Sequence, residues 1–107
     1  MPAAKLRDAE VRGIPQAYAL DANYPNPFNP STTIGYQLPM AAQVRLEIYD
    51  LMGQRVKTLV QDVEPAGYHR MMWDSLDDAG RPVAAGVYFY RLQAGEFTQA
   101  RKLLLLK

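Results

Sequence analysis

The sequence predicts an all-β fold, an immunoglobulin-like β-sandwich of about seven antiparallel strands. Three observations favour this class: short runs rich in Val, Ile, Tyr, Thr and Leu, glycines and prolines between these runs, and no sustained helical period. The chain has 107 residues, which suffices for one domain but not for a second independent core. We therefore expect one domain over residues 17–107, preceded by a flexible linker over residues 1–16.

The predicted sandwich begins with a short strand and an irregular, proline-rich segment. Ala17–Asp21 is the first candidate strand, and Tyr24–Pro30 follows it. Three prolines in Tyr24–Pro30 fix φ and remove backbone donors, so this segment is neither a helix nor a central strand. Thr32–Leu38 then alternates as a strand does, and Pro39 ends it. Its apolar face consists of Ile34, Tyr36 and Leu38.

A β-hairpin is predicted next. Gln43–Asp50 alternates cleanly, with one apolar face and one face expected to be solvated. The apolar face holds Val44, Leu46 and Ile48, and the other face holds Arg45, Glu47 and Tyr49. Leu51–Gln54 is the turn, in which Gly53 can adopt a positive φ. Arg55–Val60 returns as the partner strand.

The second half of the chain alternates between loops and strands. Gln61–Gly67 is predicted as a loop and Asp74–Ala85 as a long turn, and Ala94–Glu96 turns the chain into its last strand. The predicted strands are Tyr68–Trp73, Gly86–Gln93 and Phe97–Leu106. Their aligned side chains are His69, Met71 and Trp73 in one, and Tyr88, Tyr90 and Leu92 in another. Trp73 is the largest apolar side chain and is expected in the core.

Composition argues against several functions. The chain has no cysteine, so it has neither a disulfide nor a thiol nucleophile or ligand. Lys and Arg number 12 and Asp and Glu 11, and this balance does not recruit nucleic acid or an anionic membrane. The N-terminal residues include no apolar run of the signal-peptide type, so an export signal would lie on a longer parent protein.

No catalytic or cofactor site is predicted. His69 is the one histidine, and general-base catalysis or zinc binding would require partners that the sequence does not place beside it. The acidic turn with Asp74, Asp77, Asp78 and Gly80 fits a structural turn, because Asp and Gly are favoured there; calcium binding is the alternative. Its spacing does not match the EF-hand loop.

Tyrosines offer another alternative function. Exposed tyrosine rings can stack on sugars, which would make the chain a carbohydrate-binding or adhesive module. Cross-strand packing is the more usual role of tyrosine in strands. The candidates are Tyr36, Tyr49, Tyr68, Tyr88 and Tyr90.

Several motifs, taken together and in order, carry a family resemblance. Tyr24–Pro39 (YPNPFNPSTTIGYQLP) resembles the opening of the type A C-terminal sorting domains of the type IX secretion system. The later motifs of that family are similar to Val44–Val56, Gly67–Asp74, Asp77–Leu92 and Arg101–Lys107. The residues that carry the resemblance are Pro25, Asn26, Pro27, Phe28, Asn29, Pro30, Gly53, Trp73, Asp74, Gly86 and Tyr88. The immunoglobulin-like domain of the flagellar hook-capping protein is similar in the later motifs and is the competing assignment.

The resemblance implies a function in secretion. Domains of this family follow secreted enzymes and adhesins of Gram-negative bacteria, and they direct the parent through the periplasm and across the outer membrane. The implied partners are an outer-membrane translocon and a sortase-like protease that removes the domain at the cell surface. The family's fold is a seven-stranded immunoglobulin-like sandwich, which agrees with the strands counted above.

The end of the chain is the predicted recognition segment. It consists of Lys102, Leu103, Leu104, Leu105, Leu106 and Lys107. Because strand side chains alternate, only Leu103 with Leu105, or Leu104 with Leu106, can face the core. The other pair is then exposed unless a partner covers it, and an edge strand can pair with a partner protein or with a second copy of the chain.

Overall fold

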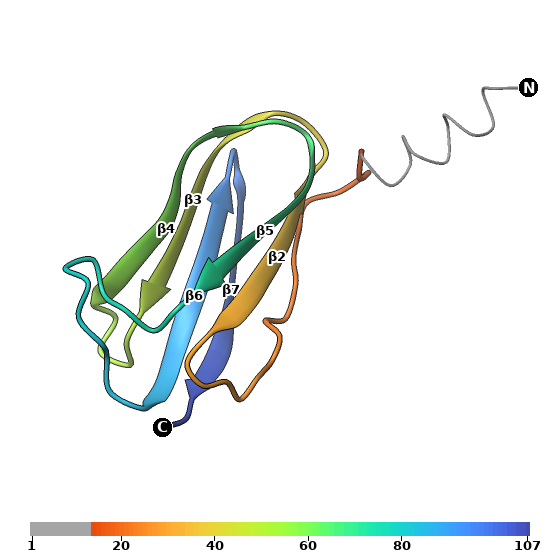
Figure 1. Ribbon diagram of the computed structural model, residues 1–107. Coiled ribbons are helices and arrows are strands. Elements are labelled where there is room, and N and C mark those ends of the chain that lie inside the picture. Colours follow the sequence, from red (N-terminus) through yellow and green to blue (C-terminus); the bar gives the residue numbers. More distant parts are fainter. Residues whose placement is uncertain (1–13) are drawn as a thin grey trace, which may run out of the picture.

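The computed structural model describes residues 14–107 and has seven strands in two antiparallel sheets (Figure 1). The strands are β1 (Ala19–Leu20), β2 (Thr32–Leu38), β3 (Ala42–Tyr49), β4 (Arg55–Glu64), β5 (Gly67–Trp73), β6 (Gly86–Ala94) and β7 (Phe97–Leu105). One sheet has the order β1-β2-β5 and the other β4-β3-β6-β7. This arrangement confirms the predicted sandwich. The described residues contain no helix long and apolar enough to cross a membrane.

The core lies between the two sheets and follows the predicted alternation. The inward side chains of β2 and β3 have 2% exposure or less: Ile34, Tyr36, Leu38, Val44, Leu46 and Ile48. Trp73 at the end of β5 is fully buried, as predicted, and packs against two rings from distant parts of the chain. Its centroid lies 5.8 Å from that of Phe28 and 5.5 Å from that of Tyr88. The indole N–H donates to the Leu76 carbonyl at 2.9 Å.

Two glycines take the backbone conformation that their turns require. Gly53 has φ +81° in the β3–β4 hairpin, where its N–H donates to the Asp50 carbonyl at 3.0 Å. Gly86 has φ +145° where the long turn enters β6. Residues other than glycine rarely adopt these φ values. The turn predicted at residues 51–54 is therefore confirmed, and Gly86 is needed in its motif for its backbone conformation.

The prediction of a loop from residue 61 is wrong. β4 continues to Glu64, and β5 already begins at Gly67. The register extends the ladder from Ala42 paired with Glu64 to Tyr49 paired with Arg55. Three of residues 61–64 are polar, and Val63 is exposed, so the segment has no buried apolar face. Its backbone groups still pair with β3, which is what makes this segment a strand.

The prediction that the second face of β3 is solvated is also wrong at one position. Glu47 is 4% exposed, although its neighbours on that face, Arg45 and Tyr49, are exposed and half-buried. Alternation predicts the direction of a side chain, but not whether neighbouring strands cover it. Side chains from β4 and β6 cover Glu47, as described below.

The start of the described chain packs beside the β6–β7 turn. The rings of Tyr18 and Phe97 stack with centroids 5.3 Å apart and an interplanar angle of 12°. The predicted linker, residues 1–16, lies outside the described residues up to residue 13, and its described part includes the buried Pro15. Lys107 lies at the other end of the sandwich, beyond the C-terminal end of β7 (Figure 1).

Candidate functional site

The predicted recognition segment forms the end of β7, the last strand at one border of the four-stranded sheet. Leu103 and Leu105 are 0% and 1% exposed and complete the core. Leu104 is half-buried on the opposite face, and Leu106 is 48% exposed. Lys102 and Lys107 are exposed. The expected division of the leucines into an inward and an outward pair is therefore what the structure contains.

The proline-rich segment covers the outer edge of this strand end. The Asn26 side-chain Oδ1 accepts a hydrogen bond from the backbone N–H of Leu104 at 3.0 Å. The Phe28 N–H donates to the Leu104 carbonyl at 3.0 Å, and the Leu106 N–H donates to the Phe28 carbonyl at 2.9 Å. We call Asn26 and Phe28 the edge cap, because they satisfy the backbone groups that an added strand would otherwise pair with.

Core packing and side-chain hydrogen bonds hold the edge cap in place. The Phe28 ring is 2% exposed and packs against Trp73. The Thr32 hydroxyl donates to the Pro25 carbonyl at 2.8 Å and accepts from the Asn23 side-chain amide at 2.9 Å. Ser75 donates to the Pro30 carbonyl. The structure therefore joins the opening motif to the closing motif, which lie at opposite ends of the domain's sequence.

The acidic turn protects the other border of the same sheet. The Asp78 Oδ1 accepts from the Thr58 N–H on β4 at 3.0 Å, and the Asp78 N–H donates to the Val56 carbonyl at 3.0 Å. An Asx side chain thus caps backbone groups at each border of the four-stranded sheet. The rest of the outer edge of β7, from Thr98 to Lys102 on the side away from β6, has no neighbouring strand among the described residues.

The turn's other carboxylates bind backbone donors. The Asp77 Oδ1 accepts from the N–H groups of Arg81 and Ala79, each at 2.9 Å. These hydrogen bonds, that of Arg81 first, lower the pKa of Asp77 from its ordinary value. Asp74 accepts from the Leu76 N–H at 3.2 Å. Within residues 14–107, no group of three or more His, Cys, Asp or Glu side chains could hold a metal ion.

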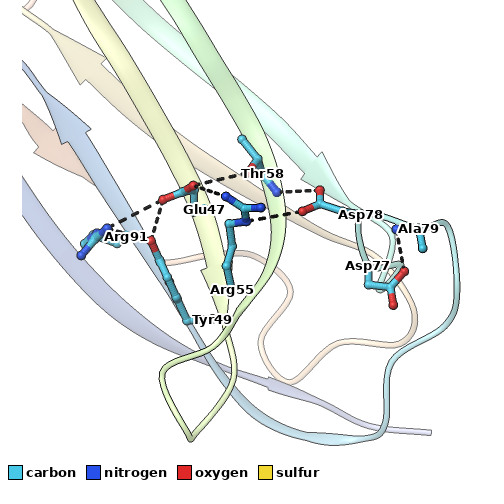
Figure 2. Close-up of polar contacts among 8 residues, drawn as sticks. All are labelled: Glu47, Tyr49, Arg55, Thr58, Asp77, Asp78, Ala79 and Arg91. Carbon is cyan, nitrogen blue, oxygen red and sulfur yellow. Dashed lines mark hydrogen bonds and ion pairs between the residues drawn. The ribbon is translucent and has the colours of Figure 1, made fainter.

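The outer face of the four-stranded sheet holds a polar cluster around Glu47 (Figure 2). The Glu47 carboxylate accepts from the Tyr49 hydroxyl at 2.5 Å and from the Thr58 hydroxyl at 3.3 Å. It lies 3.7 Å from guanidinium nitrogens of both Arg55 and Arg91. Arg91 also donates to the Tyr49 hydroxyl at 2.7 Å and lies over the Tyr49 ring. Burial, followed by the bond to Glu47, raises the pKa of Tyr49.

The histidine and most of the tyrosines have structural roles. The His69 ring stacks on Tyr36, its Nε2 lies 2.8 Å from the Pro65 carbonyl, and its Nδ1 lies 3.5 Å from Glu64. Tyr36, Tyr88 and Tyr90 are buried. Of the five tyrosines considered for sugar stacking, Tyr68 is the exposed one, at 55%.

Some contacts of this site could not be found in the sequence. The motif marked Asn26 and Phe28, but not their hydrogen bonds to residues 104–106. In the sequence, Arg101 is only the start of the closing motif. In the structure, its Nε donates to the Leu20 carbonyl at 2.6 Å and so joins β7 to the other sheet. Glu47 and Arg91 carried no local signal, because the cluster forms only when β3, β4 and β6 pair.

This architecture defines the class of protein: an immunoglobulin-like sandwich domain whose last strand is capped by its own proline-rich segment. The sequence profile of the FlgD Ig-like domain matches residues 26–96, more than half of the chain. The chain therefore belongs to the FlgD Ig-like domain family. Comparison with curated protein sequences finds no match.

Solved structures share this fold. The dimeric latent form of PorU from Porphyromonas gingivalis aligns with a TM-score of 0.67 and 21% identity, over 84% of this chain and 9% of PorU. PorZ from the same organism, a surface component of the type-IX secretion system, aligns with a TM-score of 0.52 and 19% identity, over 86% of this chain and 12% of PorZ. FlgD from Xanthomonas campestris, a hook-capping protein, aligns with a TM-score of 0.57 and 26% identity, over 92% and 72% of the chains.

Proposed function

We propose that this chain is a non-catalytic C-terminal signal domain that directs its parent protein across the outer membrane through the type IX secretion system. The parent would reach the cell surface, where a sortase-like protease would remove the domain. The partners would be the outer-membrane translocon, this protease and a preceding cargo domain.

One observation carries the proposal: the two motifs that resemble sorting domains meet at a single place. The opening motif caps the closing strand through Asn26 and Phe28, and the side chains of Leu106 and Lys107 at its end are exposed. This arrangement presents a short apolar and cationic end to a partner while the rest of the strand end is held in the fold. The fold shared with PorZ agrees with the proposal.

The absence of catalysis in the proposal is supported by the surroundings of His69. Both ring nitrogens already face protein groups, and the ring lies against Tyr36. A general base must reach a substrate proton at hydrogen-bond distance, which this packing does not favour.

The test uses the full chain fused behind a folded reporter, in a host that has this pathway. The fusion is expected at the cell surface, and a variant lacking Leu106 and Lys107 is expected in the periplasm. This truncation is sharper than one from Lys102, because Leu103 and Leu105 belong to the core and their loss would unfold the domain. An intact fusion that stays in the periplasm would contradict the proposal.

A second candidate function follows from the family match. FlgD from Xanthomonas campestris is described by its role in hook capping, and the profile match covers residues 26–96. A structural domain of this kind would assemble with a hook or filament protein. Co-sedimentation of the chain with assembled hook filaments, together with no export of the reporter, would favour this candidate over the secretion signal.

A further inference from the structure

We infer that the secretion partner reads a folded surface, the outer face of the four-stranded sheet, in addition to the chain's end, and that this partner presents an acidic protein surface. The inference rests on the proposed secretion function. We call this surface the cationic face and define it by Arg45, Tyr49, Arg55, Val87, Phe89, Arg91, Lys102 and Leu104.

The strand register places part of the recognition segment on the cationic face. Lys102 pairs with Phe89 across β6 and β7, and Leu104 pairs with Val87. Leu103 and Leu105 face the core, so Lys102 and Leu104 face outward. Phe89 in turn pairs with Tyr49 on β3. The outward half of the recognition segment is therefore one border of a surface that spans the whole sheet.

Charge on this surface is predominantly positive. Three cross-strand rows pass through Arg45, Glu47 and Tyr49. Together they carry one carboxylate, that of Glu47, and four cations: Arg45, Arg55, Arg91 and Lys102. That carboxylate is 4% exposed, so it contributes little acceptor surface. Asp78 adds one more carboxylate at the border, 3.5 Å from Arg55. Cations still exceed anions, and complementary charge speeds and directs association.

Glu47 also orients two of these cations. Its carboxylate lies between Arg55 and Arg91, whose side chains remain 56% and 41% exposed (Figure 2). Arg91 is further held by its hydrogen bond to Tyr49 and by the ring beneath it, 5.0 Å from the guanidinium carbon. Fixed guanidinium groups lose less conformational entropy on binding a carboxylate, which suits them to a protein partner.

The apolar residues of the face favour a protein as the occupant. Val87, Phe89 and Leu104 are half-buried and lie side by side across β6 and β7. Aromatic and arginine side chains are enriched at protein interfaces. A second copy of the chain would oppose one cationic face with another, so self-association is disfavoured here. The outer face of the other sheet offers no such excess, because Arg70 there is matched by Asp21 beside Gly35.

The experiment changes the face while leaving the chain's end intact. Arg45→Glu with Phe89→Gln reverses one charge and removes one ring on the cationic face. Arg70→Glu with Met72→Gln makes matched changes on the outer face of β5, where Arg70 and Met72 are exposed. Both double variants are fused to the reporter, and their thermal unfolding is compared with that of the unchanged chain. Arg45→Glu alone is a second test. Because the Arg45 side chain is exposed and lies outside the core, this change should leave the fold intact.

Loss of surface reporter in the Arg45 variants, with normal export of the Arg70 control, is the expected result. Export of the Arg45 variants at the unchanged level, while loss of Leu106 and Lys107 blocks export, would overturn the inference and keep the proposed function. No export of the unchanged fusion would instead contradict the proposed function itself.

Two measurements on the purified chain test the nature of the occupant. Sedimentation should find a monomer, and the chain should not bind vesicles of phosphatidylcholine and phosphatidylglycerol. A dimer that Arg45→Glu dissociates, or vesicle binding that Arg45→Glu abolishes, would assign the face to self-association or to lipid and overturn the inference of an acidic protein partner.

Discussion

Asn26 accepts the backbone N–H of Leu104 through its side-chain oxygen, at 3.0 Å, across 78 positions of sequence. In this way a side chain takes the place that a neighbouring strand would occupy at the sheet border. Sheet edges left open are templates for unwanted pairing, and covering them with a loop is a recognised protection. The bond therefore links the proline-rich segment to the protection of the outer edge of the last strand.

Replacing Asn26 by Ala should release the Leu104 amide. We expect faster hydrogen exchange at Leu104, with little change at Leu103, whose backbone groups face β6. The bond is exposed, so the free energy of unfolding should fall by only about 0.5–1.5 kcal/mol. Asn29→Ala is the matched control, since Asn29 is exposed in the same segment. Equal protection of Leu104 in both variants would contradict a capping role for Asn26.

Replacing Trp73 by Ala should destabilise the domain severely. The fully buried indole contacts the Phe28 and Tyr88 rings, and its loss would leave a large cavity. Changes of this kind cost about 3–5 kcal/mol, a large part of the stability of a small domain. Met72→Ala, next in sequence and 62% exposed, should leave the melting temperature nearly unchanged. Similar melting curves for the two variants would place Trp73 outside the core.

Replacing Glu47 by Gln should weaken the cluster on the cationic face. Arg55 and Arg91 would lose their shared carboxylate, while both remain partly exposed to water. Since hydrogen bonds to charged groups contribute about 1.5–3 kcal/mol, we expect a loss of stability near the lower end of that range, measured by urea unfolding. Glu96→Gln, at an exposed turn, is the control. A loss no larger than that of the control would mean that the cluster adds nothing to stability.

Alkaline pH should destabilise the domain through Tyr90. Burial raises the pKa of its hydroxyl from 10.0 to about 12, and the hydroxyl donates to the Asp21 carbonyl at 2.5 Å. Because the pKa is higher in the folded state, the neutral hydroxyl contributes its full stabilisation at pH values below 10, the pKa of the unfolded chain. This contribution is lost as pH rises from 10 toward 12. Tyr90→Phe should therefore lose less stability than the unchanged chain over this interval, as followed by denaturant midpoints. A parallel decline in both proteins would argue against this role of Tyr90.

The sequence was sufficient to predict the sandwich because strand alternation is a local property. Ile34, Tyr36 and Leu38 share a face for the same geometric reason in any sheet, and glycine at position 53 favours a turn wherever it lies. The sequence does not reveal the extension of β4 to Glu64, because Val63 is the single apolar residue among residues 61–64 and makes no alternating pattern. Only pairing with Ala42 and its neighbours on β3 makes this segment a strand.

The candidate site was predicted in outline only. The motifs identified the proline-rich segment and the closing strand, and alternation predicted one buried and one outward pair of leucines. The contact of Asn26 with Leu104 depends on how the two sheets pack, and the burial of Glu47 depends on three paired strands. Such relationships arise from tertiary structure, so no local pattern of residues could reveal them.

The stacking of Tyr18 on Phe97 holds the beginning of the domain beside the β6–β7 turn, while β7 then runs the length of the sandwich before Lys107. The described chain therefore begins at one pole of the sandwich and ends at the other (Figure 1). Under the proposed function, a passenger would precede the pole opposite to the end that a receptor would hold. Under that function, one signal of this design would serve passengers of very different size, because their dimensions would not enter the geometry of docking.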